Sequence, residues 1–138
     1  MQTRFDICLL PGDGIGVEVV EATIPVLEKA QQNFALNFRS FQAGAQHYKK
    51  TGEALPAATF EAAKKADAIL FGAMGWPEIR YPDGTEIAPQ LDLRLRLELY
   101  AGVRPARAIP GVPLPLADAR AKQIDFVVVR ENTEGLFA

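Results

Sequence analysis

Apolar runs alternate with amphipathic segments along the first half of the chain. The runs that are mostly apolar, or that alternate apolar and polar positions, predict three strands, over residues 5–10, 36–41 and 68–71. Apolar side chains at helical spacing predict three helices between them, over residues 17–33, 43–50 and 56–65. Pro25 falls inside the first helix and is expected to kink or split it. Strands that alternate with helices indicate a doubly wound α/β sheet.

The pattern changes at residue 72. Residues 72–89 carry three glycines and three prolines and show no periodicity, which in a compact domain is typical of a functional loop. Beyond this loop the sequence predicts a helix over 90–100, an extended segment over 103–109 and a buried strand over 124–130. The stretch 106–121, rich in Pro and Ala, is expected to connect two lobes. We therefore place part of a first α/β domain at residues 1–100 and the start of a second, incomplete domain at 101–138.

Composition narrows the class of protein. The 138 residues carry a formal net charge of -2, whereas a nucleic-acid binder would show a basic stripe. No apolar stretch approaches the ~20 residues that cross a bilayer, and the N-terminus lacks the apolar core of a signal peptide. Cys8 is the only cysteine and lies in an apolar run, where a buried structural thiol is expected. A cytoplasmic enzyme, or a fragment of one, fits these features.

Three arginines carry the clearest chemical signal. Arg94 lies in an amphipathic run, and Arg104 and Arg130 stand at the edges of apolar segments. Ligands of open α/β sheets bind at the carboxyl ends of strands, where Arg130 is predicted to lie. Guanidinium groups hold carboxylates through paired hydrogen bonds, so converging arginines would indicate a substrate with several carboxylates. Solvated charges or structural ion pairs are the alternative.

The glycine cluster at residues 12–16 follows a strand and precedes a helix. Backbone amides at such a helix N-terminus can face an anionic group. The cluster matches neither the dinucleotide fingerprint nor the phosphate-binding P-loop, so a tight turn that requires glycine is an equal alternative. Asp13, inside the cluster, is expected either to cap the helix or to face water.

Together these segments resemble the β-decarboxylating dehydrogenases, the family of isopropylmalate, isocitrate, homoisocitrate and tartrate dehydrogenases. The resemblance rests on LLPGDGIGVEV, LDLRLRLELYAGVRP and DFVVVRENTEG, which follow one another in the family's order. It implies an isopropylmalate-dehydrogenase-like layered α/β sheet with flanking helices. Family members are more than twice as long, so the chain is expected to correspond to their N-terminal portion.

The resemblance also implies roles for individual residues. It assigns the malate part of the substrate to Arg94, Arg104 and Arg130. It assigns contacts with NAD to Ile15 and to the loop at residues 75–87, in which Gly75, Trp76 and Ile87 are the candidates. The family reaction transfers hydride from a 2-hydroxy acid to NAD and decarboxylates it with the help of Mg²⁺ or Mn²⁺. The metal ligands and the catalytic lysine are expected beyond Ala138, so we expect the chain alone to be inactive.

Two departures from the family pattern bear on the chemistry. Phe137 stands where the family has a tyrosine acid, and it has no hydroxyl to donate a proton. Residues 87–91, which include Ala88 and Gln90, occupy the stretch that reads the variable group of the substrate. Ala88 lacks the hydroxyl that would suggest isocitrate. A strongly apolar stretch would suggest isopropylmalate, and Gln90 makes this stretch less apolar. Tartrate, malate and an alkylmalate remain open.

Two other interpretations compete with an enzyme fragment. The chain could be a non-catalytic module that binds a dicarboxylate or a protein partner, since an arginine cluster can bind without chemistry. It could also be stable only as a homodimer, because a domain cut within its fold exposes apolar surface and sheet edges.

Overall fold

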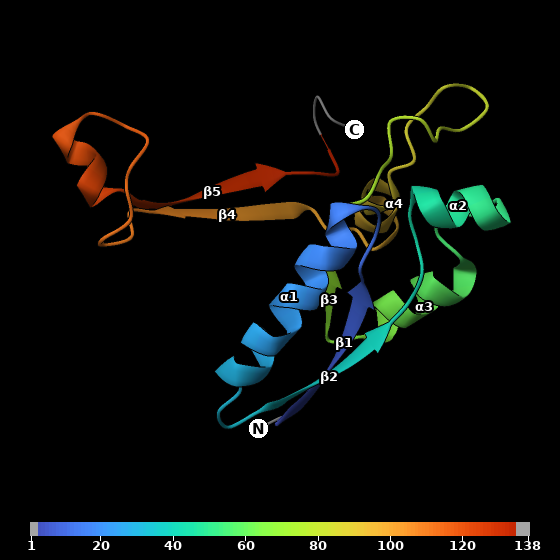
Figure 1. Ribbon diagram of the computed structural model, residues 1–138, viewed down its shortest axis with the longest axis horizontal. Helices are drawn as coiled ribbons and strands as arrows, with labels where there is room; N and C mark the ends of the chain where they lie inside the picture. Colours follow the sequence, from blue (N-terminus) through green and yellow to red (C-terminus); the bar gives the residue numbers. More distant parts are fainter. Residues whose placement is uncertain (1–2, 135–138) are drawn as a thin grey trace. The chain divides into compact units, whose positions relative to one another are not determined.

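The computed structural model describes residues 3–134 of the chain (Figure 1). The chain divides into two compact units, Met1–Leu93 and Arg94–Ala138. The sequence prediction had placed the domain boundary after residue 100.

The first unit is built on a parallel sheet of three strands. The strands are β1 (Arg4–Leu10), β2 (Ala35–Ser40) and β3 (Ala68–Phe71), in the order β2-β1-β3. They confirm the three strands predicted from the hydrophobic pattern. Because β1 pairs on both sides, its second half is the best buried segment of the sheet, and Leu10 is fully buried. Cys8 is buried there as predicted.

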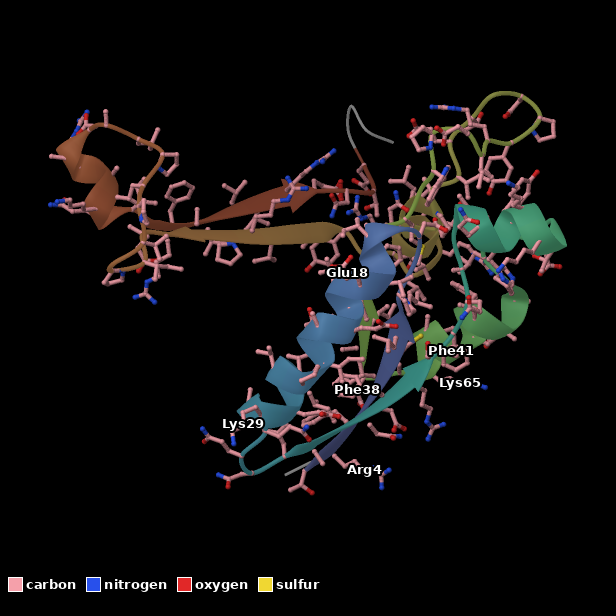
Figure 2. All side chains as sticks on the ribbon, viewed as in Figure 1. Arg4, Glu18, Lys29, Phe38, Phe41 and Lys65 are labelled. Carbon is pink, nitrogen blue, oxygen red and sulfur yellow. The ribbon has the colours of Figure 1, made fainter. Side chains whose placement is uncertain are left out.

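Helices cover both faces of this sheet. Helix α1 (Ile15–Ala30) joins β1 to β2, and helices α2 (Ala45–Thr51) and α3 (Ala57–Lys65) join β2 to β3. Figure 1 shows α1 on one side of the sheet and α3 on the other. The charged ends of Arg4 and Lys65 reach outward from this unit (Figure 2).

Helix α1 corrects one expectation. Pro25 lies inside α1 and does not split it. Pro25 is exposed, so the carbonyl that loses its hydrogen-bond donor lies on the solvent side, where water can replace the donor.

The chain after β3 follows the prediction in part. Residues 72–88 form an irregular loop, as expected, with only two isolated bridges, Trp76–Ile79 and Arg80–Glu86. Helix α4 (Pro89–Arg96) follows and ends before Tyr100, where the periodic pattern had predicted its end. The early end accompanies a left-handed backbone at Glu98, whose φ is 53°.

The second unit contains an antiparallel pair, β4 (Ala101–Arg107) and β5 (Asp125–Glu131). The segment between them ends in a short 3-10 helix, η1 (Ala119–Gln123). The expectation that residues 106–121 connect two lobes was wrong, because this stretch joins two strands of one hairpin. The expectation that β5 is buried was also wrong, since its residues 126–129 are 46–67% exposed. A two-stranded ribbon cannot cover its own faces.

No helix among residues 3–134 combines the length and the apolar character needed to cross a membrane.

Candidate functional site

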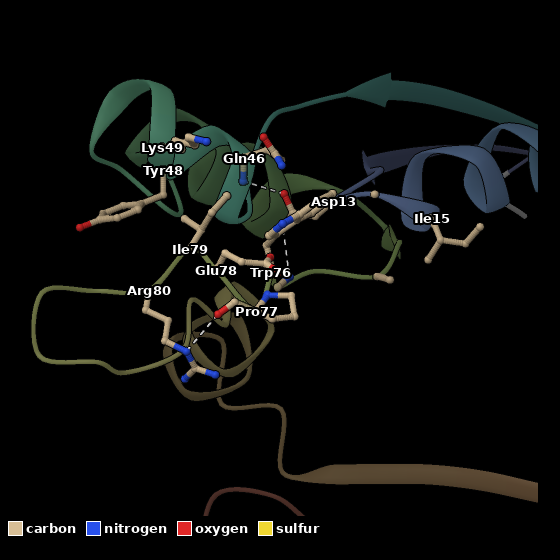
Figure 3. Close-up of a pocket in the computed structure, with 13 residues that line it drawn as sticks. Asp13, Ile15, Gln46, Tyr48, Lys49, Trp76, Pro77, Glu78, Ile79 and Arg80 are labelled. Carbon is tan, nitrogen blue, oxygen red and sulfur yellow. Dashed lines mark hydrogen bonds between the residues drawn. The ribbon is translucent and has the colours of Figure 1, made fainter.

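The first unit carries an open pocket of about 810 Å³ at the carboxyl end of β1 (Figure 3). Three segments supply its walls: the turn after β1, helix α2 and the loop after β3. The residues that line it include Asp13, Ile15, Gln46, Gly75, Trp76 and Arg80. The carboxyl ends of parallel strands are the usual ligand-binding edge of an α/β sheet, so this is the candidate functional site of the unit.

Asp13 is buried at the point where the three segments meet, with 3% of its surface exposed. Its Oδ2 accepts hydrogen bonds from the backbone N–H of Ala45 at 2.7 Å and of Gly75 at 2.9 Å. Its Oδ1 accepts a hydrogen bond from the backbone N–H of Gln46 at 2.8 Å. Asp13 therefore caps α2, and neither of the two expectations for it, a cap on α1 or a solvated charge, was right. The N-cap position of α2 is Gly44, which offers no side chain of its own to accept these hydrogen bonds.

An aromatic and an aliphatic side chain form the apolar part of the pocket wall. Trp76 is 38% exposed and Ile15 is 61% exposed, and both line the pocket. The ring of Trp76 packs close to Gly14, where an added Cβ would lie 3.0 Å from Cζ3 of the ring. A side chain at position 14 would therefore push the indole away, so the glycine keeps the ring against the turn.

The loop that carries Trp76 is anchored despite its irregular backbone. Ile87 is 1% exposed and packs with Ala45 and Ala54, while the rings of Tyr48 and Tyr81 meet edge to face at 5.1 Å. These contacts fix the loop to α2.

Arg80 holds the loop from within. Its guanidinium donates to the carbonyls of Pro77 at 3.2 Å and Gly84 at 3.1 Å and pairs with Glu86 at 3.0 Å. These bonds join three points of the loop through one side chain, so the contribution of Arg80 to the pocket is to hold the shape of the loop.

The four residues predicted to contact NAD divide into two groups. Ile15, Gly75 and Trp76 line the same pocket. Ile87 is a buried residue of the loop and lines a smaller neighbouring cavity of about 290 Å³, together with Gly75, Trp76 and Gln90. Oε1 of Gln90 is buried and has no hydrogen-bond partner among residues 3–134.

In the second unit, the hairpin brings Arg104 and Arg130 together. Arg130 pairs with Gly102 across the hairpin, and Arg104 pairs with Val128, which places both arginines on one face at diagonal positions. Diagonal positions of an antiparallel pair are roughly 7–8 Å apart, close enough for two guanidinium groups to hold one small dicarboxylate. Arg107 lies on the other face, where it pairs with Asp125 at 3.3 Å.

Arg94, the third predicted arginine, lies on α4 and is half-buried. Its carbonyl accepts a hydrogen bond from the backbone N–H of Leu99 at 2.9 Å. Phe137 lies outside the described residues.

The carboxylate next to Arg130 accepts hydrogen bonds from backbone N–H groups. Glu131, which follows Arg130, accepts hydrogen bonds from the backbone N–H groups of Glu134 and Thr133, and these bonds hold the pKa of Glu131 below its usual range. Within residues 3–134, no group of three or more His, Cys, Asp or Glu side chains could hold a metal ion.

Sequence reasoning missed Asp13 as the junction of the pocket, and it missed Arg80 as the clamp of the loop. One signal for Asp13 was available, because the segment Gln42-Ala43-Gly44 before α2 has no Ser, Thr, Asp or Asn to cap it. A helix without a local cap takes its partner from elsewhere or from water.

Comparisons with known proteins agree with the motifs. A family model described as isocitrate/isopropylmalate dehydrogenase matches residues 6–138. The chain is 43% identical to a tartrate dehydrogenase/decarboxylase of Pseudomonas putida, over 97% of this chain and 38% of that protein. It is 46% identical to a 3-isopropylmalate/3-methylmalate dehydrogenase of Methanocaldococcus jannaschii, over 95% of this chain and 35% of that protein.

The fold agrees as well. A crystal structure of isocitrate dehydrogenase from Methylococcus capsulatus superposes with a TM-score of 0.73 at 33% identity, covering 96% of this chain and 36% of that one. The α/β class and the isopropylmalate-dehydrogenase-like layered sheet are thereby confirmed, in partial form. In each of these comparisons, the chain spans little more than a third of the relative's length.

Proposed function

Because the chain belongs to the isocitrate/isopropylmalate dehydrogenase family, we propose that it supplies two binding elements of an NAD-dependent hydroxy-acid dehydrogenase. The first unit receives the nicotinamide part of NAD, and the second unit receives the carboxylates of a 2-hydroxy dicarboxylic acid. The observation that carries the proposal is the shared face of Arg104 and Arg130 on the hairpin. Two guanidinium groups on one face match a dianion better than a single charge.

The pocket of the first unit fits a planar ring with a neighbouring polar group. Trp76 and Ile15 offer an apolar wall, and Gln46 and Lys49 add polar groups to the lining. Sites for cofactors combine such an apolar wall with a few polar groups that fix orientation. In this proposal, the pocket orients the nicotinamide against the apolar wall.

When bound, NAD accepts the hydride from the hydroxy acid, and a divalent metal assists the decarboxylation. The residues of this chain bind and orient the substrate through its carboxylates. We assign no step through the metal to them, because the described residues do not form a ligand cluster. Relatives named tartrate and isopropylmalate/methylmalate dehydrogenases support malate-type substrates as the class. We also propose a cytoplasmic homodimer as the assembled form.

A non-catalytic module for a dicarboxylate or a protein partner is the second candidate. It needs only Arg104 and Arg130 and no metal, and the exposed residues 126–129 beside Arg130 would suit a protein partner. Binding of a dicarboxylate without any nucleotide effect on the first unit would favour it.

Nuclear magnetic resonance on the ¹⁵N-labelled chain tests the two elements separately. NAD or nicotinamide mononucleotide should shift the amide signals of Ile15 and Gly75 and the indole signal of Trp76. D-malate or tartrate should shift the guanidinium signals of Arg104 and Arg130 and leave that of Arg120, which is paired with Asp118, unchanged. Absence of shifts at both sets of signals would reject the proposal.

A further inference from the structure

The buried carboxylate of Asp13 joins the turn that bears it to the other two walls of the pocket, helix α2 and the loop after β3. Oδ2 is shared between the first turn of α2 and the loop after β3, through Ala45 and Gly75. Oδ1 holds the second amide of α2, that of Gln46. The backbone of Asp13 adds a further link to the loop, since its N–H donates to the carbonyl of Ala73 at 2.8 Å.

The pocket residues divide among the segments that these bonds join. Ile15 follows Asp13 by two residues at the start of α1, so this part of the pocket wall is attached to the turn that carries Asp13. Trp76 follows Gly75 directly, so the amide bonded to Oδ2 is one residue from the indole-bearing backbone. Figure 3 shows Asp13 between Gln46 and the loop that bears Trp76. A change in the carboxylate would therefore alter the distance between the Ile15 wall and the Trp76 wall.

This side chain must accept hydrogen bonds on both of its oxygens. All three donors are backbone N–H groups, and two of them belong to the positive N-terminal end of a helix. A carboxylate offers acceptors on both oxygens, whereas the isosteric amide of Asn points an NH₂ group at one of the donors. Asparagine would therefore lose at least the bond to Gln46 or the shared pair on Oδ2.

We propose that Asp13 is a positioning residue for the nucleotide pocket, acting through the amides of α2 and Gly75 to set the separation of Ile15 and Trp76. This inference rests on the proposed function for its ligand but not for its geometry. Asp13 does not need to touch the nucleotide, and its effect is on binding rather than on the chemistry of hydride transfer.

The test compares Asp13→Asn with the unsubstituted chain in two measurements. Amide hydrogen exchange without ligand should show faster exchange at Gly75 and Gln46 and a changed indole signal for Trp76. Titration with nicotinamide mononucleotide should show affinity lower by about tenfold, because the Ile15 and Trp76 walls are no longer held in the arrangement that fits the ring. Asp67→Asn is the matched control, because Oδ2 of Asp67 also accepts a distant backbone N–H, that of Asp6 at 2.8 Å, but lies outside the pocket.

If Asp13→Asn does not fold, a second pair of variants keeps the test open. Gln46→Pro and Gln46→Ala both remove the side chain, but only proline removes the N–H that donates to Oδ1, and proline is tolerated in the first turn of a helix. The proline variant alone should then speed exchange at Gly75.

The outcomes separate the two claims. Unchanged exchange at Gly75 and an unchanged Trp76 signal in Asp13→Asn would overturn the positioning role, and so would equal nucleotide affinity in the two chains. Failure of the unsubstituted chain to respond to nucleotide would overturn the proposed function of the pocket, and the exchange rates alone would then decide the role of Asp13.

Discussion

Gly44 leaves the space that the carboxylate of Asp13 occupies. A Cβ atom on Gly44 would lie 2.5 Å from Oδ2 of Asp13, and the φ of Gly44 is 111°. Both the contact and the backbone angle therefore require glycine at the start of α2.

Gly44→Ala should destabilise the chain strongly. The variant combines an overpacked contact with a backbone angle that alanine rarely adopts, so we expect a loss of roughly 2–4 kcal/mol in the free energy of unfolding. Gly52→Ala is the matched control, since Gly52 has a φ of 82° at the other end of α2 but nothing within 4 Å of its added Cβ. It should cost about 1 kcal/mol. Equal losses in urea denaturation would show that the contact with Asp13 is unimportant.

Gln90→Leu should stabilise the chain. The substitution removes an acceptor oxygen that is buried without a partner, and leucine has a similar volume, so a gain of about 1 kcal/mol is expected. Gln42→Leu replaces an exposed glutamine and should change the free energy of unfolding by less than about 0.5 kcal/mol. A clear loss of stability in Gln90→Leu would mean that the oxygen has a partner in solution.

Arg130→Ala should abolish binding of D-malate or tartrate measured by calorimetry. The variant leaves one guanidinium for the dianion, and the loss of an exposed charge pair, up to about 1 kcal/mol, is more than a small ligand on an open hairpin can lose and remain detectably bound. Arg107→Ala is the control, because Arg107 lies on the opposite face and pairs with Asp125. Equal losses in the two variants would indicate a general effect of charge rather than a site.

Stability should fall as the pH rises above the ordinary thiol pKa of 9.0. Burial raises the pKa of Cys8, so the folded chain keeps the thiol proton in a pH range where the unfolded chain releases it. The stabilising contribution is complete below 9.0 and is lost as the pH rises through the raised pKa of the folded state. The difference between the pH profiles of the unsubstituted chain and Cys8→Ala isolates this effect from other groups. Parallel profiles up to pH 11 would contradict it.

The chain alone should not turn over substrate. An assay with NAD, Mn²⁺ and a panel of malates is expected to show no reduction of NAD, because residues 3–134 provide no cluster of metal ligands. Turnover at an ordinary enzymatic rate would show that residues 1–138 contain a complete active site.

The sequence predicted the sheet of the first unit well because β1 and β3 are short apolar runs that end before Pro11 and Gly72, and β2 alternates apolar and polar residues. The core strand β1 and helix α2, which is capped by Gly52, are encoded by residues within or next to the element itself. The exposure of β5 was not predictable in the same way. Its run of valines is typical of a buried strand, and only the absence of a covering layer in the described residues makes it exposed.

The candidate site was predicted in part, for a similar reason. Arg104 and Arg130 could be selected from their positions beside apolar runs, and the pairing of β4 with β5 supplies the shared face. The role of Asp13 depends on contacts with residues 32, 33 and 62 positions away, which no local pattern encodes. Non-local hydrogen bonds of one side chain with the backbone leave almost no trace in periodicity.

Every donor to the Asp13 carboxylate is a main-chain amide. Such an anchor is indifferent to the identity of the side chains that it secures, apart from proline and the glycines that fit around it. Substitutions at Gln46 or Trp76 could therefore change the pocket lining while the backbone hydrogen bonds to Asp13 stay in place. These two positions are practical sites at which to engineer a different ligand preference.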